Sequence, residues 1–264
     1  MSDNDKHVSQ YATSATLTTR RGLYDTNVGV SLTDRLIEQL KLDMATSLLD
    51  VGCGYGADIA TVIGRYPKLH CVGFDQSEAQ INDAKIKTPS AIFFVADANN
   101  FQLDETFDRI LVRHVLHLLP DPSAAIDNIL RHCKPGGRVV FATHSTQSQP
   151  KFAAWRTWFK DKTGIGYSAH SDKLTLENNQ DLFTKPGCKV EFIKAEETIS
   201  LTDPEPYLAY IKGQKRWSRE PSEIEMNELL EYVRNQIQTE IDEHGHFEDA
   251  SINGIITLDH ELAG

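Results

Sequence analysis

Short apolar runs alternate with helix-forming stretches between Ser47 and His144, and this order constrains the fold more than any other feature. The apolar runs are, in chain order, LLDVG, HCVGFD, AIFFVAD, RILVRHV and GRVVFATH, and helix-like sequences such as ADIATVIGRY and SEAQINDAKIKT separate them. Parallel strands cannot be joined by a tight turn and usually need a helical crossover. The alternation therefore predicts an α/β fold with a doubly wound, mostly parallel sheet.

The flanking segments extend this plan. Apolar residues recur at helical spacing in Ser31–Leu42, so we expect an N-terminal helical cap in residues 1–44 and the main domain in residues 45–264. A sixth strand is predicted in CKVEFIKAEETISL, and a seventh, INGIITLDH, is predicted to form a hairpin-like last strand. Between them the chain is charged and helical over about 203–249, which predicts an inserted helical lid.

The charge balance narrows the range of partners. The 264 residues include 38 acidic and 27 basic ones, and the formal net charge of −11 repels a phosphate backbone, so no nucleic-acid partner is expected. No run approaches the roughly 20 apolar residues that span a bilayer, so no membrane association is expected. The four cysteines form no CxxC pair, which together with the polar N-terminus predicts a cytoplasmic protein. A homodimer is compatible with this composition.

A glycine-rich turn follows the first predicted strand. In Asp50–Gly56 the sequence DVGCGYG lets the backbone turn sharply and approach a ligand at the start of a helix. Gly52, Gly54 and Ala57 also satisfy the pattern of dinucleotide-binding proteins, and a purely structural turn would need the same glycines. The turn alone therefore indicates a nucleotide-like cofactor without choosing which one.

Acidic residues at the ends of the first three strands help to identify the cofactor. Asp50, at the end of the first strand, lies two residues before Gly52, where it suits a cationic ligand. Asp75 ends the second strand, where a carboxylate can accept hydrogen bonds from ribose hydroxyls. Asp97 and Ala98 end the third strand, where a carboxylate and a backbone amide can bind adenine. The alternative for each acid is a helix cap or a turn residue. Together the three positions favour S-adenosylmethionine.

Four ordered motifs, LLDVGCGYG, GFD, VADA and FDRILVRHVLHLLPDP followed by KPGGRVVF, resemble the class I S-adenosylmethionine-dependent methyltransferases over about residues 45–145. The resemblance implies a Rossmann-like, seven-stranded sheet and S-adenosyl-L-methionine as the cofactor of the domain in residues 45–264. The residues it assigns to the cofactor are Gly52 and Gly54 at the methionine moiety, Asp75 at the ribose, Gln76, Asp97 and Ala98 at the adenine, and Arg113 and His114 at the methionine end beside the acceptor.

Methyl transfer from a sulfonium is an in-line displacement, so alignment of the nucleophile, the methyl carbon and the sulfur can supply much of the acceleration. An oxygen or ammonium nucleophile must also lose a proton, and histidine is the usual base near neutral pH. His117, just past the fourth strand, is the first candidate base, and His144, at the end of the fifth strand, is the second. His114 also lies at the exit of the fourth strand, and His170 lies in the loop beyond the fifth. The alternative for His117 is a packing residue at the start of a helix.

Aromatic walls that exclude water would suit the loss of charge in the transition state. The candidates are Tyr11, Tyr24, Trp155, Trp158 and Phe159, although each is also explained as an ordinary core or surface aromatic. The histidines near the strand ends follow no recognised metal-ligand spacing, so no metal is expected.

The function predicted from these features is methyl transfer to an oxygen or nitrogen of a small-molecule acceptor of the specialised-metabolite type. Two alternatives stay open, namely a C-methyltransferase acting on a prenyl or polyketide-like acceptor and a non-catalytic protein that only binds S-adenosylmethionine. The intact cofactor motifs argue against lost binding. RHVLHLLP stands where base methyltransferases of nucleic acids carry an NPPY-type or DPPY-type run, which argues against that substrate.

Overall fold

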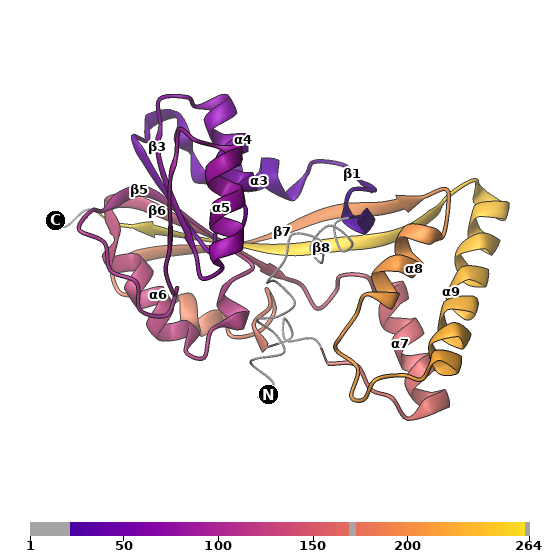
Figure 1. The fold of residues 1–264 in the computed structure, drawn as a ribbon. Coiled ribbons are helices and arrows are strands. Elements are labelled where there is room, and N and C mark those ends of the chain that lie inside the picture. Colours follow the sequence, from indigo (N-terminus) through magenta and orange to yellow (C-terminus); the bar gives the residue numbers. More distant parts are fainter. Residues whose placement is uncertain (1–21, 169–172, 262–264) are drawn as a thin grey trace.

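The computed structural model describes residues 22–168 and 173–261, and in that part of the chain one mixed sheet organises the fold (Figure 1). Its strands are β1 (Asn27–Val28), β2 (Ser47–Val51), β3 (His70–Asp75), β4 (Ile92–Val95), β5 (Phe107–Arg113), β6 (Cys133–His144), β7 (Cys188–Leu201) and β8 (Phe247–His260). The order across the sheet is β1-β7-β8-β6-β5-β2-β3-β4. The pairs from β6 through β4 are parallel, whereas β8 is antiparallel to both β6 and β7. The predicted α/β class with a mostly parallel sheet is confirmed.

The described residues form eight strands, one more than the seven predicted. The additional strand is β1, in which only Asn27 and Val28 pair with Ile199 and Thr198 of β7. A strand of two residues has no alternation that a sequence pattern can reveal. Each of the seven predicted apolar runs is a strand, and β7 and β8 form the predicted antiparallel hairpin.

Helices fill the crossovers and the insertion. They are α3 (Leu32–Leu40), α4 (Ala57–Arg65), α5 (Glu78–Lys87), α6 (Pro122–Arg131), α7 (Pro150–Thr163), α8 (Glu205–Lys212) and α9 (Glu223–His244), with 3₁₀ turns η1 (Leu42–Met44), η2 (Leu116–Leu118) and η4 (Gln180–Phe183). Side-chain caps fix where several begin: Asp121 accepts a hydrogen bond from the Ala124 backbone at the start of α6, and Ser222 and Glu225 form a capping box on α9. None of the described helices is long and apolar enough to cross a membrane.

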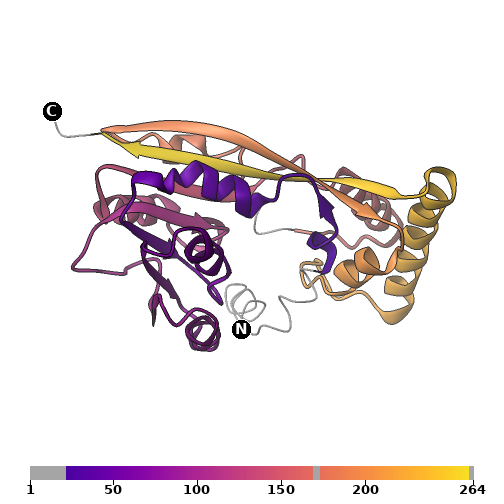
Figure 2. The same ribbon diagram turned by 90° about the horizontal axis from the view of Figure 1, so that it is seen from above.

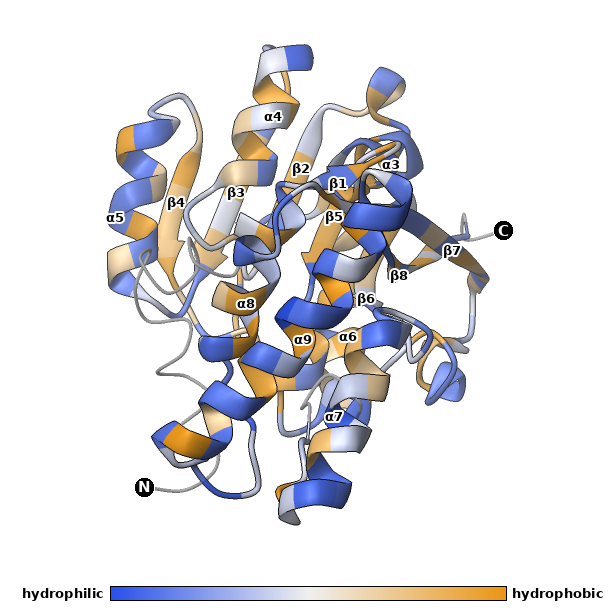
Figure 3. Cartoon of the chain, turned by 90° about the vertical axis from the view of Figure 1, so that its right-hand side faces the viewer, coloured by the Kyte–Doolittle hydropathy of each residue, from blue (hydrophilic) through white to orange (hydrophobic). Residues whose placement is uncertain are grey.

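Two apolar cores lie on opposite faces of the sheet. On one face, Leu36 of α3 and Ile59 of α4 pack in a cluster with Val140 of β6. On the other, Ile126 of α6 packs in a cluster with Phe141 of β6. Figure 3 shows hydrophobic residues concentrated on the strands and polar residues along α9. Burial of both faces, as a parallel sheet requires, leaves the carboxyl edge of the strands for a ligand.

A third core lies at the far end of the β7–β8 hairpin. The hairpin extends beyond the parallel strands and carries α7, α8 and α9 at its end (Figures 1 and 2). Phe159, Tyr207, Val233 and Phe247 are fully buried there, one each from α7, α8, α9 and β8. In the chain, α8 and α9 stand between β7 and β8, where the sequence predicts inserted helices.

Candidate active site

The glycine-rich turn connects β2 to α4 and needs glycine for its geometry. Gly52 and Gly54 have φ angles of 71° and 54°, in the left-handed region that favours glycine. The backbone N–H groups of Gly52 and Cys53 both donate to the Phe74 carbonyl of β3, at 2.9 Å. A Cβ atom on Gly52 would lie 2.4 Å from Cγ2 of Val115. Gly52 therefore lets the turn contact the segment that follows β5.

Asp75 joins the end of β3 to this turn. Its Oδ2 accepts a hydrogen bond from the Gly54 backbone N–H, and its Oδ1 accepts one from the Ser77 backbone N–H, each at 3.0 Å. The structure thus brings together two residues that the sequence predicts to bind the cofactor. Each carboxylate oxygen has a second lone pair, so Asp75 can still accept from a pair of hydroxyl groups.

Asp50 is buried at the end of β2, with 2% of its surface exposed. Its Oδ2 has no hydrogen-bond partner in the structure. Burial, reinforced by the carboxylate of nearby Asp58, raises the pKa of Asp50 well above its usual range, although Arg113 opposes the shift. A buried acid with an unsatisfied oxygen is suited to a cationic partner, because a positive charge would compensate for its burial.

The three residues predicted at the adenine lie at the edge of the sheet beyond β3 and β4. Gln76 is exposed directly after β3. Asp97 is also exposed, and its Oδ1 accepts hydrogen bonds from the backbone N–H of Asn99 at 2.9 Å and from its side-chain amide at 2.6 Å. Ala98 is buried in the core. Asp97 therefore forms a turn of the kind that the sequence left as its alternative, and its contact with adenine stays a prediction.

Three histidines predicted at the ends of two neighbouring strands meet at the carboxyl edge. The rings of His114 and His144 stack with centroids 4.4 Å apart, and the His117 ring meets His144 edge-on at 5.5 Å. His114 has a left-handed backbone, with φ of 55°. Burial, followed by the neighbouring His144 and Arg113, lowers the pKa of His114 well below its usual value. The His114 imidazole is therefore neutral at physiological pH.

Arg113 turns its side chain away from this cluster. Its Nη1 donates to Asp58 Oδ1 at 2.7 Å and to Thr33 Oγ1 at 2.9 Å, on the face of the sheet that α3 and α4 cover. The guanidinium thus ties the two helices together. This leaves the Arg113 backbone as the part that can border the cofactor.

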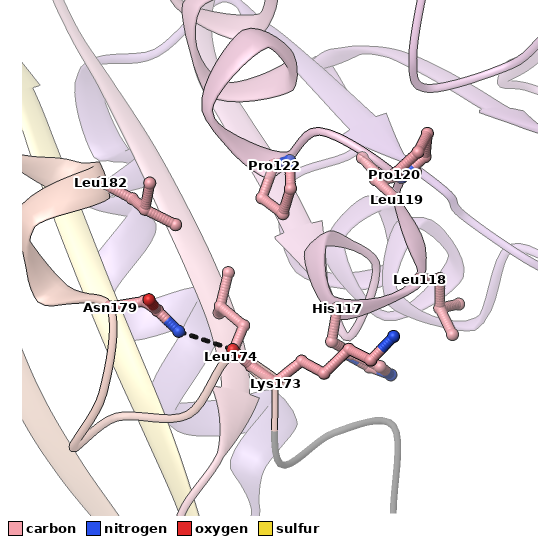
Figure 4. Close-up of a pocket in the computed structure, with 9 residues that line it drawn as sticks. All are labelled: His117, Leu118, Leu119, Pro120, Pro122, Lys173, Leu174, Asn179 and Leu182. Atoms are coloured by element: carbon pink, nitrogen blue, oxygen red, sulfur yellow. Dashed lines mark hydrogen bonds between the residues drawn. The ribbon is translucent and has the colours of Figure 1, made fainter.

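His117 also lines a cavity of about 330 Å³ on the α6 side of the cluster (Figure 4). The other lining residues are Leu118, Leu119, Pro120, Pro122, Lys173, Leu174, Asn179 and Leu182. The cavity lies within the range of about 300 to 1,000 Å³ that is usual for small-molecule pockets. His117, a candidate base, therefore lies at a cavity large enough for a small molecule.

The segment after Lys173 forms the far wall of this cavity and is anchored to the end of β6. Thr143 Oγ1 donates to the Leu174 carbonyl at 2.7 Å, and the Leu176 backbone N–H donates to the His144 carbonyl at 2.9 Å. The Glu177 carboxylate accepts hydrogen bonds from the loop that follows β6. Sequence patterns give no signal for this wall, because its contacts join residues about thirty positions apart.

The aromatic candidates belong mainly to the helical end of the molecule. Trp155 and Phe159 are buried in its core, and the ring of Trp158 stacks on Tyr232 at 3.9 Å. The Tyr24 ring meets Tyr210 edge-on at 5.9 Å. Packing accounts for each of these contacts, as the alternative interpretation predicted. Tyr11 and His170 lie outside the described residues.

No group of three or more potential ligands among residues 22–168 and 173–261 is arranged to hold a metal ion. The absence of a metal site stays a prediction for the chain as a whole.

A family model described as a methyltransferase domain matches residues 24–191, which is more than half of the chain. The chain belongs to this methyltransferase family. It is an S-adenosylmethionine-dependent enzyme, and S-adenosyl-L-methionine is its cofactor. The match includes the glycine turn, the Asp75 junction and all three clustered histidines.

Relatives and solved structures agree with this assignment. The methyltransferase is 24% identical over 198 residues to trans-aconitate 2-methyltransferase of Enterobacter sp. (strain 638), covering 74% of this chain and 78% of that protein. It is 21% identical over 202 residues to the enzyme of the same name from Escherichia coli O1:K1 / APEC, with the same shares covered.

Two solved structures share its fold. The plantazolicin methyltransferase BpumL, in complex with SAH, has a TM-score of 0.52 at 17% identity, covering 98% of this chain and 92% of that one. The YcgJ protein from Bacillus subtilis has a TM-score of 0.55 at 15% identity, covering 88% and 98%.

The geometry of the turn fits S-adenosylmethionine. Among the described residues, the atom nearest to a Cβ built on Gly54 is Gln80 Oε1, at 3.8 Å, so these residues leave the space beside this part of the turn open. Asp75 retains acceptor capacity for ribose hydroxyls, and the unsatisfied oxygen of buried Asp50 suits the positive charge that the cofactor carries.

Proposed function

We propose that this methyltransferase methylates an oxygen or nitrogen atom of a small organic molecule bound beside His117. The observation that carries the proposal is that His117 both lines the cavity and contacts His144, whose ring stacks on His114 at the end of β5. The name of the trans-aconitate 2-methyltransferases supports a small-molecule acceptor. The net charge of −11 argues against a nucleic acid in this role.

The cofactor, when bound, supplies an electrophilic methyl group on a positively charged sulfur. Asp75 and the Gly54 turn would hold its ribose and methionine parts, and Asp50 would offset its positive charge. His117 is placed to accept the proton that the acceptor oxygen or nitrogen must lose. Because His114 is buried and neutral, it adds no positive charge that would oppose protonation of His117.

The experiment begins with labelled S-adenosylmethionine and pools of metabolites, from which mass spectrometry identifies the methylated product. With that acceptor, we expect His117→Ala to lower the methylation rate by about 10²- to 10⁴-fold, the usual contribution of a general base. The acid limb of the wild-type pH–rate profile should disappear with the imidazole. Affinity for S-adenosylhomocysteine, measured by calorimetry, should be almost unchanged.

His70→Ala is the matched control, because His70 is a partly exposed histidine that pairs with Glu105 away from the cavity. This variant should keep both the rate and the pH profile. If His117→Ala also keeps both, His117 is a packing residue, and the same measurements on His144→Ala test the second candidate base.

We also propose that residues 203–249 form a lid over the acceptor and that residues 1–44 act as the cap. Support comes from a contact between the two segments: the hydroxyl groups of Tyr24 and Tyr210 lie 3.4 Å apart. Tyr210 is buried in α8, and its hydroxyl also donates to Gln149 Oε1 at 3.4 Å, in the loop that follows β6. Through these hydrogen bonds, a movement of the loop that follows β6 can be transmitted to both segments.

A further inference from the structure

Most of the residues that line the His117 cavity are apolar. Six of the nine are leucines or prolines, contributed by η2, the loop after it, the start of α6 and the segment from Leu174 to Leu182. The other three are His117, Lys173 and Asn179, and none of the nine carries a negative charge. Polar and apolar atoms both face the cavity, so it suits an amphipathic ligand whose hydrocarbon part contacts the leucines and prolines.

Lys173 is exposed and places one positive charge at the edge of this cavity. Figure 4 shows its side chain on the side of the cavity that also carries His117 and Leu118. Among residues 22–168 and 173–261, no carboxylate lies within ion-pair distance of its ammonium group. The nearby Asn179 side chain is already engaged, because its Nδ2 donates to the Lys173 carbonyl at 2.6 Å.

Hydrogen bonds hold the backbone from the Lys173 carbonyl to Thr175 in place. Asn179 holds the Lys173 carbonyl, and the next residue, Leu174, accepts a hydrogen bond from Thr143 Oγ1 at 2.7 Å. The Thr175 backbone N–H donates to Asn178 Oδ1 at 2.7 Å. A fixed backbone limits where the ammonium can reach, so less order has to be gained when an anion binds.

We propose that the acceptor is an amphipathic hydroxy or amino monocarboxylate. Its carboxylate pairs with Lys173, its hydrocarbon body lies against the leucines and prolines of the cavity, and its hydroxyl or amino group faces His117 and is the group that is methylated and loses a proton. This inference rests on the proposed function, because it takes the cavity beside His117 as the acceptor site. It also predicts an acceptor different from the trans-aconitate in the name of its relatives. Trans-aconitate has three carboxylates, and two of them would face leucines and prolines without a cationic partner, which burial penalises.

The test compares three probes on the full-length protein saturated with S-adenosylhomocysteine, by isothermal titration calorimetry. They are decanoate, the uncharged decan-1-ol of equal chain length, and trans-aconitate. Decanoate should bind roughly tenfold more tightly than decan-1-ol, since a hydrogen bond to a charged group is among the stronger ones. Trans-aconitate should not displace it.

Lysine variants test whether Lys173 supplies the positive charge that binds the carboxylate. Lys173→Met should remove the preference for decanoate over decan-1-ol, Lys173→Arg should keep it, and Lys189→Met, which removes an exposed lysine of β7, should leave it unchanged. Melting temperature and S-adenosylhomocysteine binding confirm that each variant is folded. The comparison of decanoate with decan-1-ol on the wild type tests the inference even if a variant fails to fold.

Two results would overturn the inference: equal binding of decanoate and decan-1-ol to the wild type, or tighter binding of trans-aconitate than of decanoate. Either result, in a protein that binds S-adenosylhomocysteine and whose methylation depends on His117, leaves the proposed function standing. Loss of the His117 dependence instead refutes the proposed function, and with it the acceptor site assumed here.

Discussion

Asp75 offers the sharpest test of the cofactor site, because it has one role in the turn and another toward the ligand. In Asp75→Ala, the Gly54 and Ser77 backbone N–H groups lose their acceptor. The two hydrogen bonds that we propose between Asp75 and the ribose hydroxyls are lost as well. Such bonds contribute about 1.5 to 3 kcal/mol each, and water replaces part of this in the variant. We expect a net loss of about 2 to 4 kcal/mol in binding S-adenosylhomocysteine, or roughly 30- to 700-fold in Kd.

Asp75→Asn refines the measurement. The asparagine keeps one oxygen that can accept from Gly54 or Ser77 but loses the charge, so its binding should be weakened by only about 1 to 2 kcal/mol. Asp83→Ala, which removes an exposed acid of α5, is the control and should bind like the wild type. Calorimetry with S-adenosylhomocysteine and with NAD measures all of these. Wild-type affinity in Asp75→Ala, or tighter binding of NAD than of S-adenosylhomocysteine by the wild type, would refute the reasoning.

Two further predictions concern the turn and the lid. Gly52→Ala should lower the free energy of unfolding by about 2 to 4 kcal/mol in urea titrations, because it combines a left-handed backbone with a Cβ atom 2.4 Å from Val115. The control is Gly64→Ala in α4, where the new Cβ would meet no described atom within 4 Å outside its own helix, and it should be neutral or slightly stabilising. Equal losses in the two variants would contradict this explanation. Hydrogen exchange in residues 203–249 should slow when S-adenosylhomocysteine and the acceptor bind together, whereas unchanged exchange there with both bound would argue against a lid.

The strands were predictable because their signal is local. Five apolar runs, each followed by a turn or a helical pattern, identify β2 to β6 without any knowledge of contacts. The same pattern placed Asp75 at the end of a strand, next to the glycine turn in space. Strand β1 escaped prediction because its two residues pair only where β7 passes them.

The details of the site depend on contacts that no local pattern encodes. The sequence placed His114, His117 and His144 at neighbouring strand ends, but their ring contacts require the left-handed backbone of His114 and the pairing of β5 with β6. The position of Lys173 at the cavity could not be predicted from the sequence. Lys173 lies there because a segment that reads as an irregular loop is hydrogen-bonded to the end of β6.

The β7–β8 hairpin limits how α8 and α9 can be exchanged between related enzymes. The first residues of β8, 247–252, pair with β7 alone, and pairing with β6 begins at Asn253. In this stretch Ile199, Leu201 and Phe247 are buried in the same core as the helices. A graft that replaced α8 and α9 alone would set these three side chains against foreign surfaces. The natural unit of exchange is therefore the helices together with the ends of both strands, so the junctions of a chimaera belong within the hairpin, near Asn253 and its partner Ala195.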